Sequence, residues 1–344
     1  MPENLVVKPT KDEEVIKESK LAKVSKFREL GLLGFIIILG IFVQLRNPSF
    51  LTLENLNDLL VNMAILSILA LGMMLVLITR GIDLSIGATL ALAGMISAQI
   101  VSTNQHLHPL IIILIGILIG MFCGFCNGFL VAKLSILPII ATLATMNIFR
   151  GSTFIVSDGE WVSSYQMPES FLNIATGKLF GINNLIMIAV IIYIIFFYFV
   201  NHTRTGRYIY AIGSNPDSAK ISGIHADRIL LLVYTIMGGL AGLSGVLWVS
   251  KFASAQGDTA TGYELTVIAA CILGGVSIAG GSGKISGVIL GAALIGLLNN
   301  SLPLMKVSPF WQSGIHGFII LVAVIINVLV KRGLERNALL RRRI

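Results

Sequence analysis

The apolar residues of this chain come in blocks that are long enough to cross a lipid bilayer. A membrane-spanning helix needs about 20 mostly apolar residues, because each residue rises about 1.5 Å through a hydrocarbon core about 30 Å thick. Ten blocks are candidates for such spans: 30–46, 59–79, 84–103, 109–132, 135–149, 184–200, 229–249, 265–281, 285–302 and 313–331. We therefore expect an all-α polytopic membrane protein with about ten transmembrane helices.

The composition of the chain fits a lipid environment better than an aqueous one. Hydrophobic residues make up 55% of the 344 residues and charged residues only 12%, whereas soluble domains are about 25% charged. The net charge of +8 does not indicate nucleic-acid binding, because the basic residues cluster at the two ends of the chain. Cys123, Cys126 and Cys271 lie inside apolar segments, where cysteine behaves as a small hydrophobic residue. We expect neither a disulfide framework nor a redox site.

The distribution of basic residues predicts the orientation, because cytoplasmic loops carry an excess of Lys and Arg. If the N-terminus lies in the cytoplasm, ten alternating spans place most of the 25 basic residues on the cytoplasmic side. The exceptions are Arg46, Arg150, Lys178, Lys251 and Lys306. We therefore expect both termini to be cytoplasmic, with a charged tail at 1–29, a transmembrane domain at 30–331 and a basic tail at 332–344.

Two polar segments between the spans are long enough to contact partner proteins. One is an outside loop at 150–183, and the other is a cytoplasmic loop at 201–228. Within the cytoplasmic loop, Asn215 suits a helix N-cap, Pro216 suits the first helical position and Gly223 suits a C-terminal stop. From the residues alone, this short helix is either a solvated connector or a docking element.

Glycine-rich stretches interrupt the spans at two places. The sequence GGVSIAGGSGKISG, from Gly274 to Gly287, predicts that the chain unwinds between the eighth and ninth spans. The sequence TRGIDLSIG interrupts the second and third spans, and its Gly81 and Gly87 precede Gly281 and Gly287 by 200 residues, which is compatible with a weak internal repeat. Interrupted spans in corresponding positions point to the substrate path of a transporter, since unwound backbone is tolerated only against protein or a water-filled cavity.

Six polar residues in or near the spans are candidates for that path: Asp83, Ser85, Asn62, Glu264, Asn299 and Asn300. Asp83 either caps the next helix through the amide of Ser85 or faces the path, and Glu264 allows the same two roles. We expect Asn62 to bridge helices, whereas Asn299 and Asn300 allow either role. Amides, hydroxyls and few ions are compatible with a neutral sugar as the substrate.

The chain shows no energy source of its own. The sequence GGSGKIS lacks the P-loop pattern, because Ile278 and Ile285 stand where that loop needs Gly and Ser or Thr. Neither metal-ligand spacing nor a hydrolase motif is present, so we expect neither an enzyme nor a metal site. Transport coupled to protons or sodium needs buried ionisable residues, and the span interiors hold very few. A separate ATPase is therefore favoured over a proton-coupled transporter. The long outside loop and the capped cytoplasmic helix, which suggest two partner surfaces, favour it over a passive channel.

Three stretches of the chain carry longer motifs: LGMMLVLITRGIDLSIGATLALAG, HTRTGRYIYAIGSNPDSAKISGI and SAQGDTATGYELTVIAACILGGVSIAGGSGKISG. They resemble the membrane subunits of ATP-binding-cassette (ABC) importers for simple sugars, and those of the ribose permease subfamily most closely. The resemblance, which runs from about Asn47 to Val330, implies about ten spans, a homodimer, a cytoplasmic ATPase that hydrolyses the ATP, and an extracytoplasmic sugar-binding protein. Asp83 and Glu264 stand in the family's GIDLS and GYEL motifs.

The resemblance also implies a role for the short cytoplasmic helix and favours one substrate. The helix would be the coupling helix that docks in a groove of the ATPase. It comprises Asn215, Pro216, Asp217, Ser218, Ala219, Lys220, Ile221, Ser222 and Gly223. Ribose is the favoured substrate, and the alternatives are xylose, galactose, rhamnose or a furanosyl signalling molecule, because the binding protein largely selects the sugar. The implied location is the bacterial cytoplasmic membrane.

Overall fold

The long apolar helices predicted from the sequence form a bundle. The computed structural model describes residues 11–308 and the separate residues 311, 312, 314, 315, 317, 318, 321, 322 and 325. Within these residues, eight helices are long and apolar enough to cross a membrane. They are α1 (Lys11–Arg46, apolar from Glu29), α2 (Leu53–Ile78), α3 (Ile86–Thr103), α4 (Pro109–Ala132), α5 (Pro138–Ser157), α7 (Asn184–His202), α10 (Ala226–Phe252) and α12 (Ile285–Leu304). The prediction of an all-α polytopic membrane protein is confirmed.

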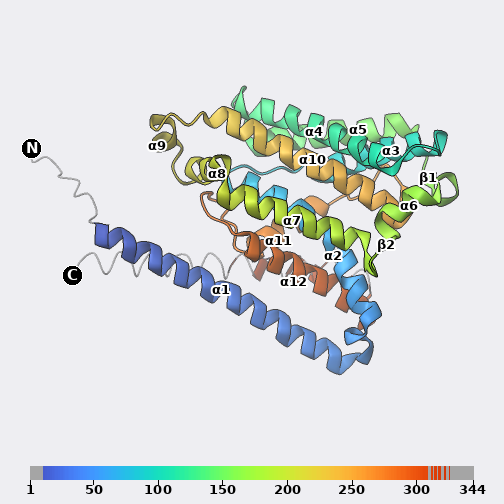
Figure 1. The fold of residues 1–344 in the computed structure, drawn as a ribbon, viewed down its shortest axis with the longest axis horizontal. Helices are drawn as coiled ribbons and strands as arrows, with labels where there is room; N and C mark the ends of the chain where they lie inside the picture. The colour runs from blue at the N-terminus through green and yellow to red at the C-terminus, as the bar shows by residue number, and fades with distance from the viewer. Residues whose placement is uncertain are drawn as a thin grey trace, which may run out of the picture.

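The two ends of the bundle carry different small elements (Figure 1). At one end lie α8 (Arg204–Ser214) and α9 (Pro216–Ile221), and we call this the α9 end. At the other lie α6 (Glu169–Thr176) and two short antiparallel strand pairs, and we call this the α6 end. The strand pairs are β1 (Val162–Ser163) with β4 (Ser254–Ala255), and β2 (Lys178–Leu179) with β3 (Ile182–Asn183).

Helix α2 forms the centre of the bundle and α1 lies at its edge. Every residue from Ala64 to Ile78 in α2 is buried. Helix α1 packs mainly on α12, through a cluster that includes Val43, Phe50 and Leu297. From Glu29 onward, the other apolar side chains of α1 are largely exposed, as expected of a helix surface that faces lipid.

Glycines bring α4 and α10 into direct backbone contact. A Cβ atom added to Gly120 would lie 2.1 Å from the carbonyl oxygen of Gly238, and one added to Gly124 would lie 2.2 Å from that of Tyr234. Membrane helices associate through close packing, because lipid provides no hydrophobic force between them. Direct contact between the two backbones therefore fixes the α4–α10 crossing.

The eighth predicted span, 265–281, is wrong. Helix α11 covers only Tyr263–Leu273, and its 11 residues rise about 16 Å, about half of the hydrocarbon thickness. Residues 274–284 form a loop in which Gly275, Gly280 and Gly281 have positive φ, a backbone region that other residues rarely adopt. The predicted unwinding between the eighth and ninth spans is confirmed, since α12 begins only at Ile285.

The fifth predicted span, 135–149, ends too early, because α5 continues through Arg150 to Ser157. The guanidinium of Arg150 donates to the carbonyl oxygens of Gly257 and Thr259 at 2.9 and 2.7 Å, so its charge does not end the helix. The segment expected to be the outside loop, 150–183, therefore begins as helix.

The two ends of the chain are only partly described. Helix α1 already begins at Lys11, inside the expected tail 1–29. Residues 1–10 and the basic tail 332–344 lie outside the described residues, and the tenth predicted span, 313–331, lies largely outside them.

Candidate functional site

The short helix predicted from Asn215 to Gly223 is present as α9, and local signals explain its limits. The Asn215 side chain accepts a hydrogen bond from the Ser218 amide at 3.0 Å, and Pro216 occupies the first helical turn. Asp217 in the first turn and Lys220 in the last match the partial charges of the helix ends. Beyond the C-cap Ser222, Gly223 has a φ of +80°, which favours glycine.

Helix α9 presents an exposed face at the end of the bundle. Only Ala219 of this helix is buried, at 4% exposed. Ile221 is 88% exposed, between the exposed Lys220 and Ser222. Ile221 therefore adds an apolar contact to the exposed face of α9, next to the charge of Lys220.

Asp83, in the first glycine-interrupted segment, is the centre of a buried hydrogen-bond network. It is 1% exposed and accepts from the Ser85 amide at 2.9 Å and the Ser85 hydroxyl at 2.7 Å. The expected hydrogen bond to the Ser85 amide is therefore present, although Ser85 itself occupies the N-cap position of α3.

Two helices close this network from the side. The Asn127 side chain of α4 donates to the Ser85 hydroxyl at 2.7 Å and lies 3.4 Å from Asp83 Oδ1. The Thr145 hydroxyl of α5 donates to Asn127 Oδ1 at 2.6 Å. The sequence interpretation missed Asn127 and Thr145, although Asn127 is an isolated polar residue in an apolar span. In this conformation, the network links segment 79–85 to α4 and α5 and is closed to solvent.

Glu264 lies where two interrupted helices begin. It belongs to the first turn of α11, and its Oε2 atom is 2.8 Å from the place that a Cβ of Gly87, in the first turn of α3, would occupy. The same Cβ would lie 2.6 Å from the carbonyl oxygen of Ala260. The starts of α3 and α11 are therefore packed together, with the charge of Arg150 nearby.

The three candidate asparagines lie in the half of the bundle toward the α6 end. Asn62 Oδ1 accepts from Lys251 Nζ at 2.6 Å, which joins α2 to α10 as expected for a bridging residue. Asn300 of α12 and Asn55 of α2 exchange hydrogen bonds of 2.9 and 3.1 Å, and Asn299 is exposed. The six candidate path residues thus form separate groups, and of these only Asp83 and Ser85 share a network.

Metal-binding side chains do not cluster in the part of the chain that the structure describes. Within it, no group of three or more His, Cys, Asp or Glu residues is placed to hold a metal ion.

Comparisons with known proteins agree on the class of this chain. The family model described as branched-chain amino acid transport system / permease component matches residues 55–324. The ribose import permease protein RbsC of Escherichia coli is 37% identical over 299 residues, which cover 86% of this chain and 92% of the relative. That of Bacillus subtilis is 39% identical over 300 residues, which cover 87% and 92%. The L-arabinose transport system permease protein AraH of Escherichia coli is 36% identical over 299 residues, which cover 87% and 90%. No solved structure matches the chain.

Proposed function

Because this chain belongs to the family of membrane permeases described as branched-chain amino acid transport system / permease component, we propose that it is the membrane-spanning subunit of a bacterial ABC importer for a monosaccharide. It is a multi-pass protein of the cytoplasmic membrane and a transport subunit without an ATPase site of its own. The similarity to sugar permeases over 86% or more of the chain carries this proposal.

Ribose is the proposed substrate. The ribose import permeases are 37% and 39% identical to this chain, against 36% for the arabinose permease. The other simple sugars are therefore the competitors in the uptake assay. They include arabinose, xylose, galactose and rhamnose, together with furanosyl signalling molecules.

In the proposed orientation, the α9 end lies in the cytoplasm. This end carries a set of basic residues, as expected of cytoplasmic loops: Arg80, Lys133, Arg204, Arg207, Lys220, Arg228 and Lys284. At the α6 end, α6 and the two strand pairs then lie outside. Both termini are cytoplasmic in this arrangement.

The partners follow from this orientation. A cytoplasmic ABC ATPase docks on α9, the coupling helix, through the exposed Ile221 and its charged neighbours. An extracytoplasmic sugar-binding protein delivers the sugar at the α6 end, and two copies of the chain form the translocation unit. ATP is hydrolysed by the partner subunit, and this chain converts the closure of the ATPases into alternating access.

The proposed path uses the candidate residues in order from outside to inside. Asn299, Asn300 and Asn62 lie toward the outer end, Glu264 lies where α3 and α11 begin, and Asp83 with Ser85 lies beyond. The starts of interrupted helices offer backbone amides in the interior of the bundle, which suits the hydroxyl groups of a neutral sugar.

Uptake of radiolabelled ribose into proteoliposomes tests the function. The vesicles hold this chain with its cognate ATPase and binding protein, and they enclose ATP or, as a control, a non-hydrolysable analogue. Uptake that needs ATP hydrolysis and is blocked best by unlabelled ribose supports the proposal. Stronger competition by another sugar changes only the substrate. Uptake by this chain alone contradicts the importer, and loss of that uptake with a protonophore would indicate a proton-coupled transporter.

A further inference from the structure

Arg80, which follows α2 and opens the first glycine-interrupted segment, holds the end of α8. Its Nε and Nη2 atoms donate to the carbonyl oxygens of Gly213 and Ser214, each at 2.8 Å. These residues are the last two of α8, and carbonyl groups at a helix C-terminus lack partners within the helix. A cation at this position also complements the helix dipole. Arg80 therefore fastens segment 79–85 to α8 through two charged hydrogen bonds.

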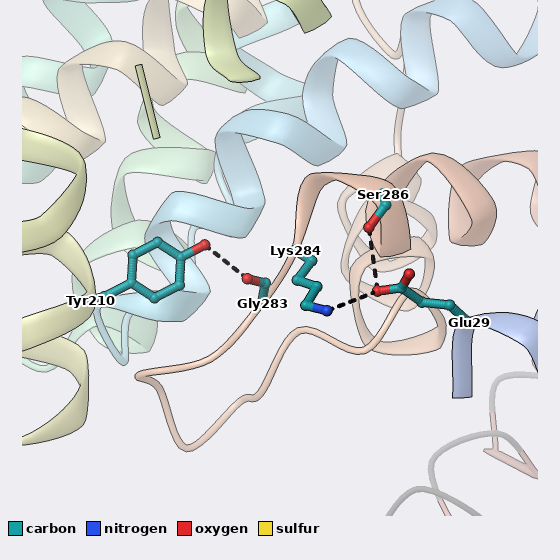
Figure 2. Close-up of polar contacts among 5 residues, drawn as sticks. All are labelled: Glu29, Tyr210, Gly283, Lys284 and Ser286. Carbon is teal, nitrogen blue, oxygen red and sulfur yellow. Dashed lines mark hydrogen bonds and ion pairs between the residues drawn. The ribbon is translucent and has the colours of Figure 1, made fainter. Parts of the chain in front are cut away.

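Tyr210 fastens the same helix to the second glycine-interrupted segment. Its hydroxyl donates to the carbonyl oxygen of Gly283 at 2.7 Å (Figure 2). Burial raises the pKa of Tyr210 to about 12, so the hydroxyl keeps its proton at physiological pH. Because Tyr210 and Gly213 are three residues apart, they lie on one face of α8.

Direct backbone contacts join the three parts. The Gly281 amide donates to the Ile78 carbonyl oxygen at 2.9 Å. A Cβ atom on Gly213 would lie 1.8 Å from that oxygen and 2.7 Å from the Gly281 nitrogen. The end of α2, the loop 274–284 and α8 are thus in direct backbone contact.

The end of this loop is held from the opposite side by α1. Glu29 pairs with Lys284 at 3.6 Å and accepts a hydrogen bond from the Ser286 hydroxyl at 3.2 Å (Figure 2). The segment 283–286 therefore lies between Tyr210 of α8 and Glu29 of α1. A displacement of the loop is passed on to the start of α12.

We infer that α8 is the transmission element of the importer, and that Arg80 and Tyr210 are positioning residues that carry its movement to both interrupted segments. This inference rests on the proposed function, in which the ATPase moves α9. Asn215 alone separates α9 from α8, so the movement reaches α8 directly. Arg80 carries it to segment 79–85 and the Asp83 network, and Tyr210 carries it to loop 274–284, which connects α11 with α12.

The test is the number of sugar molecules imported per ATP hydrolysed, measured in the proteoliposomes described above. Tyr210→Phe removes only the hydroxyl, and Arg80→Lys keeps the charge but loses the two-pronged contact. Each variant should import about threefold to tenfold less sugar per ATP, as expected for the loss of one hydrogen bond of about 1 kcal/mol. ATP hydrolysis and co-purification of the ATPase should remain near wild type.

Tyr193→Phe is the matched control. Tyr193 of α7 also donates its hydroxyl to a backbone carbonyl, that of Ser67 at 3.2 Å, but it lies outside the α8 junction. Its sugar-to-ATP ratio should equal that of the wild type.

Each alternative outcome has a separate meaning. A merely structural role of Tyr210 would reduce the amount of assembled complex, lower uptake and hydrolysis together and leave the ratio unchanged, which would overturn the inference. Equal losses in Tyr210→Phe and Tyr193→Phe would also overturn it. If the wild-type complex itself shows no ATP-dependent uptake, the proposed function fails before the variants are compared. If the Arg80→Lys variant does not assemble with the ATPase, the Tyr210→Phe variant alone tests the inference.

Discussion

The α4–α10 crossing makes Gly120→Ala a demanding test of the packing described above. The added methyl group would lie 2.1 Å from the Gly238 oxygen and within 2.7 Å of the backbone nitrogen and Cα of Gly242, whereas ordinary contact begins at 3.4 Å. The two helices must therefore separate locally by about 1.3 Å. Both sides of the contact are helix backbone, so no side chain can rotate away.

Overpacking of this kind costs about 1–3 kcal/mol. Each kcal/mol lowers Tm by about 2–4 °C in domains of 150–250 residues, so a decrease of about 5 °C is expected in a thermal unfolding assay on the purified protein in detergent. Gly151→Ala on α5 is the matched control, because nothing lies within 4 Å of its added methyl group. Its Tm should stay the same or rise, since Ala favours helix over Gly. Equal Tm values for the two variants would refute the argument that backbone contact fixes this crossing.

Two further predictions concern the docking face and the buried network. Ile221→Ser should weaken co-purification of the ATPase by about tenfold, because it removes an apolar anchor worth more than 1 kcal/mol. Leu53→Ser is the control: Leu53 is equally exposed but lies at the α6 end, so the variant should bind the ATPase as the wild type does. Equal binding of the ATPase by both variants would argue against docking on α9. Asn127→Leu removes the partner of Ser85 and Thr145 and should lower the free energy of unfolding by about 1–3 kcal/mol. Asn147→Leu should change it little, because the exposed Asn147 amide donates to the Leu143 carbonyl of its own helix.

The features that the sequence predicts correctly are those that depend on neighbouring residues. Helix α9 begins and ends as expected because its cap, its proline and its terminal glycine all act within nine residues. The hydrogen bond from Ser85 to Asp83 spans two positions. Long apolar helices such as α4 follow from length and composition alone.

The features that the sequence does not predict depend on residues far apart in the chain. Arg150 appeared to end a span, but carbonyl groups more than 100 positions away accept its hydrogen bonds. Asn127 and Thr145 become part of the Asp83 network only when α4 and α5 pack beside α3. From the sequence, Arg80 is only one of the basic residues that predict the orientation of the spans. The carbonyl groups in α8 that accept its hydrogen bonds lie 133 and 134 positions farther along the chain.

The packed starts of α3 and α11 show why movement at the α9 end matters for transport. The first amides of any helix lack partners within that helix, and here Glu264 lies between two such ends, where a carboxylate is favoured by both helix dipoles. Gly87 permits this approach, because a Cβ there would meet the Ala260 oxygen at 2.6 Å. In the inferred mechanism, a pull on loop 274–284 moves α11, and a pull on segment 79–85 moves α3. Separation of the two starts then opens the contact between Gly87 and Glu264 to a solute without unfolding either helix.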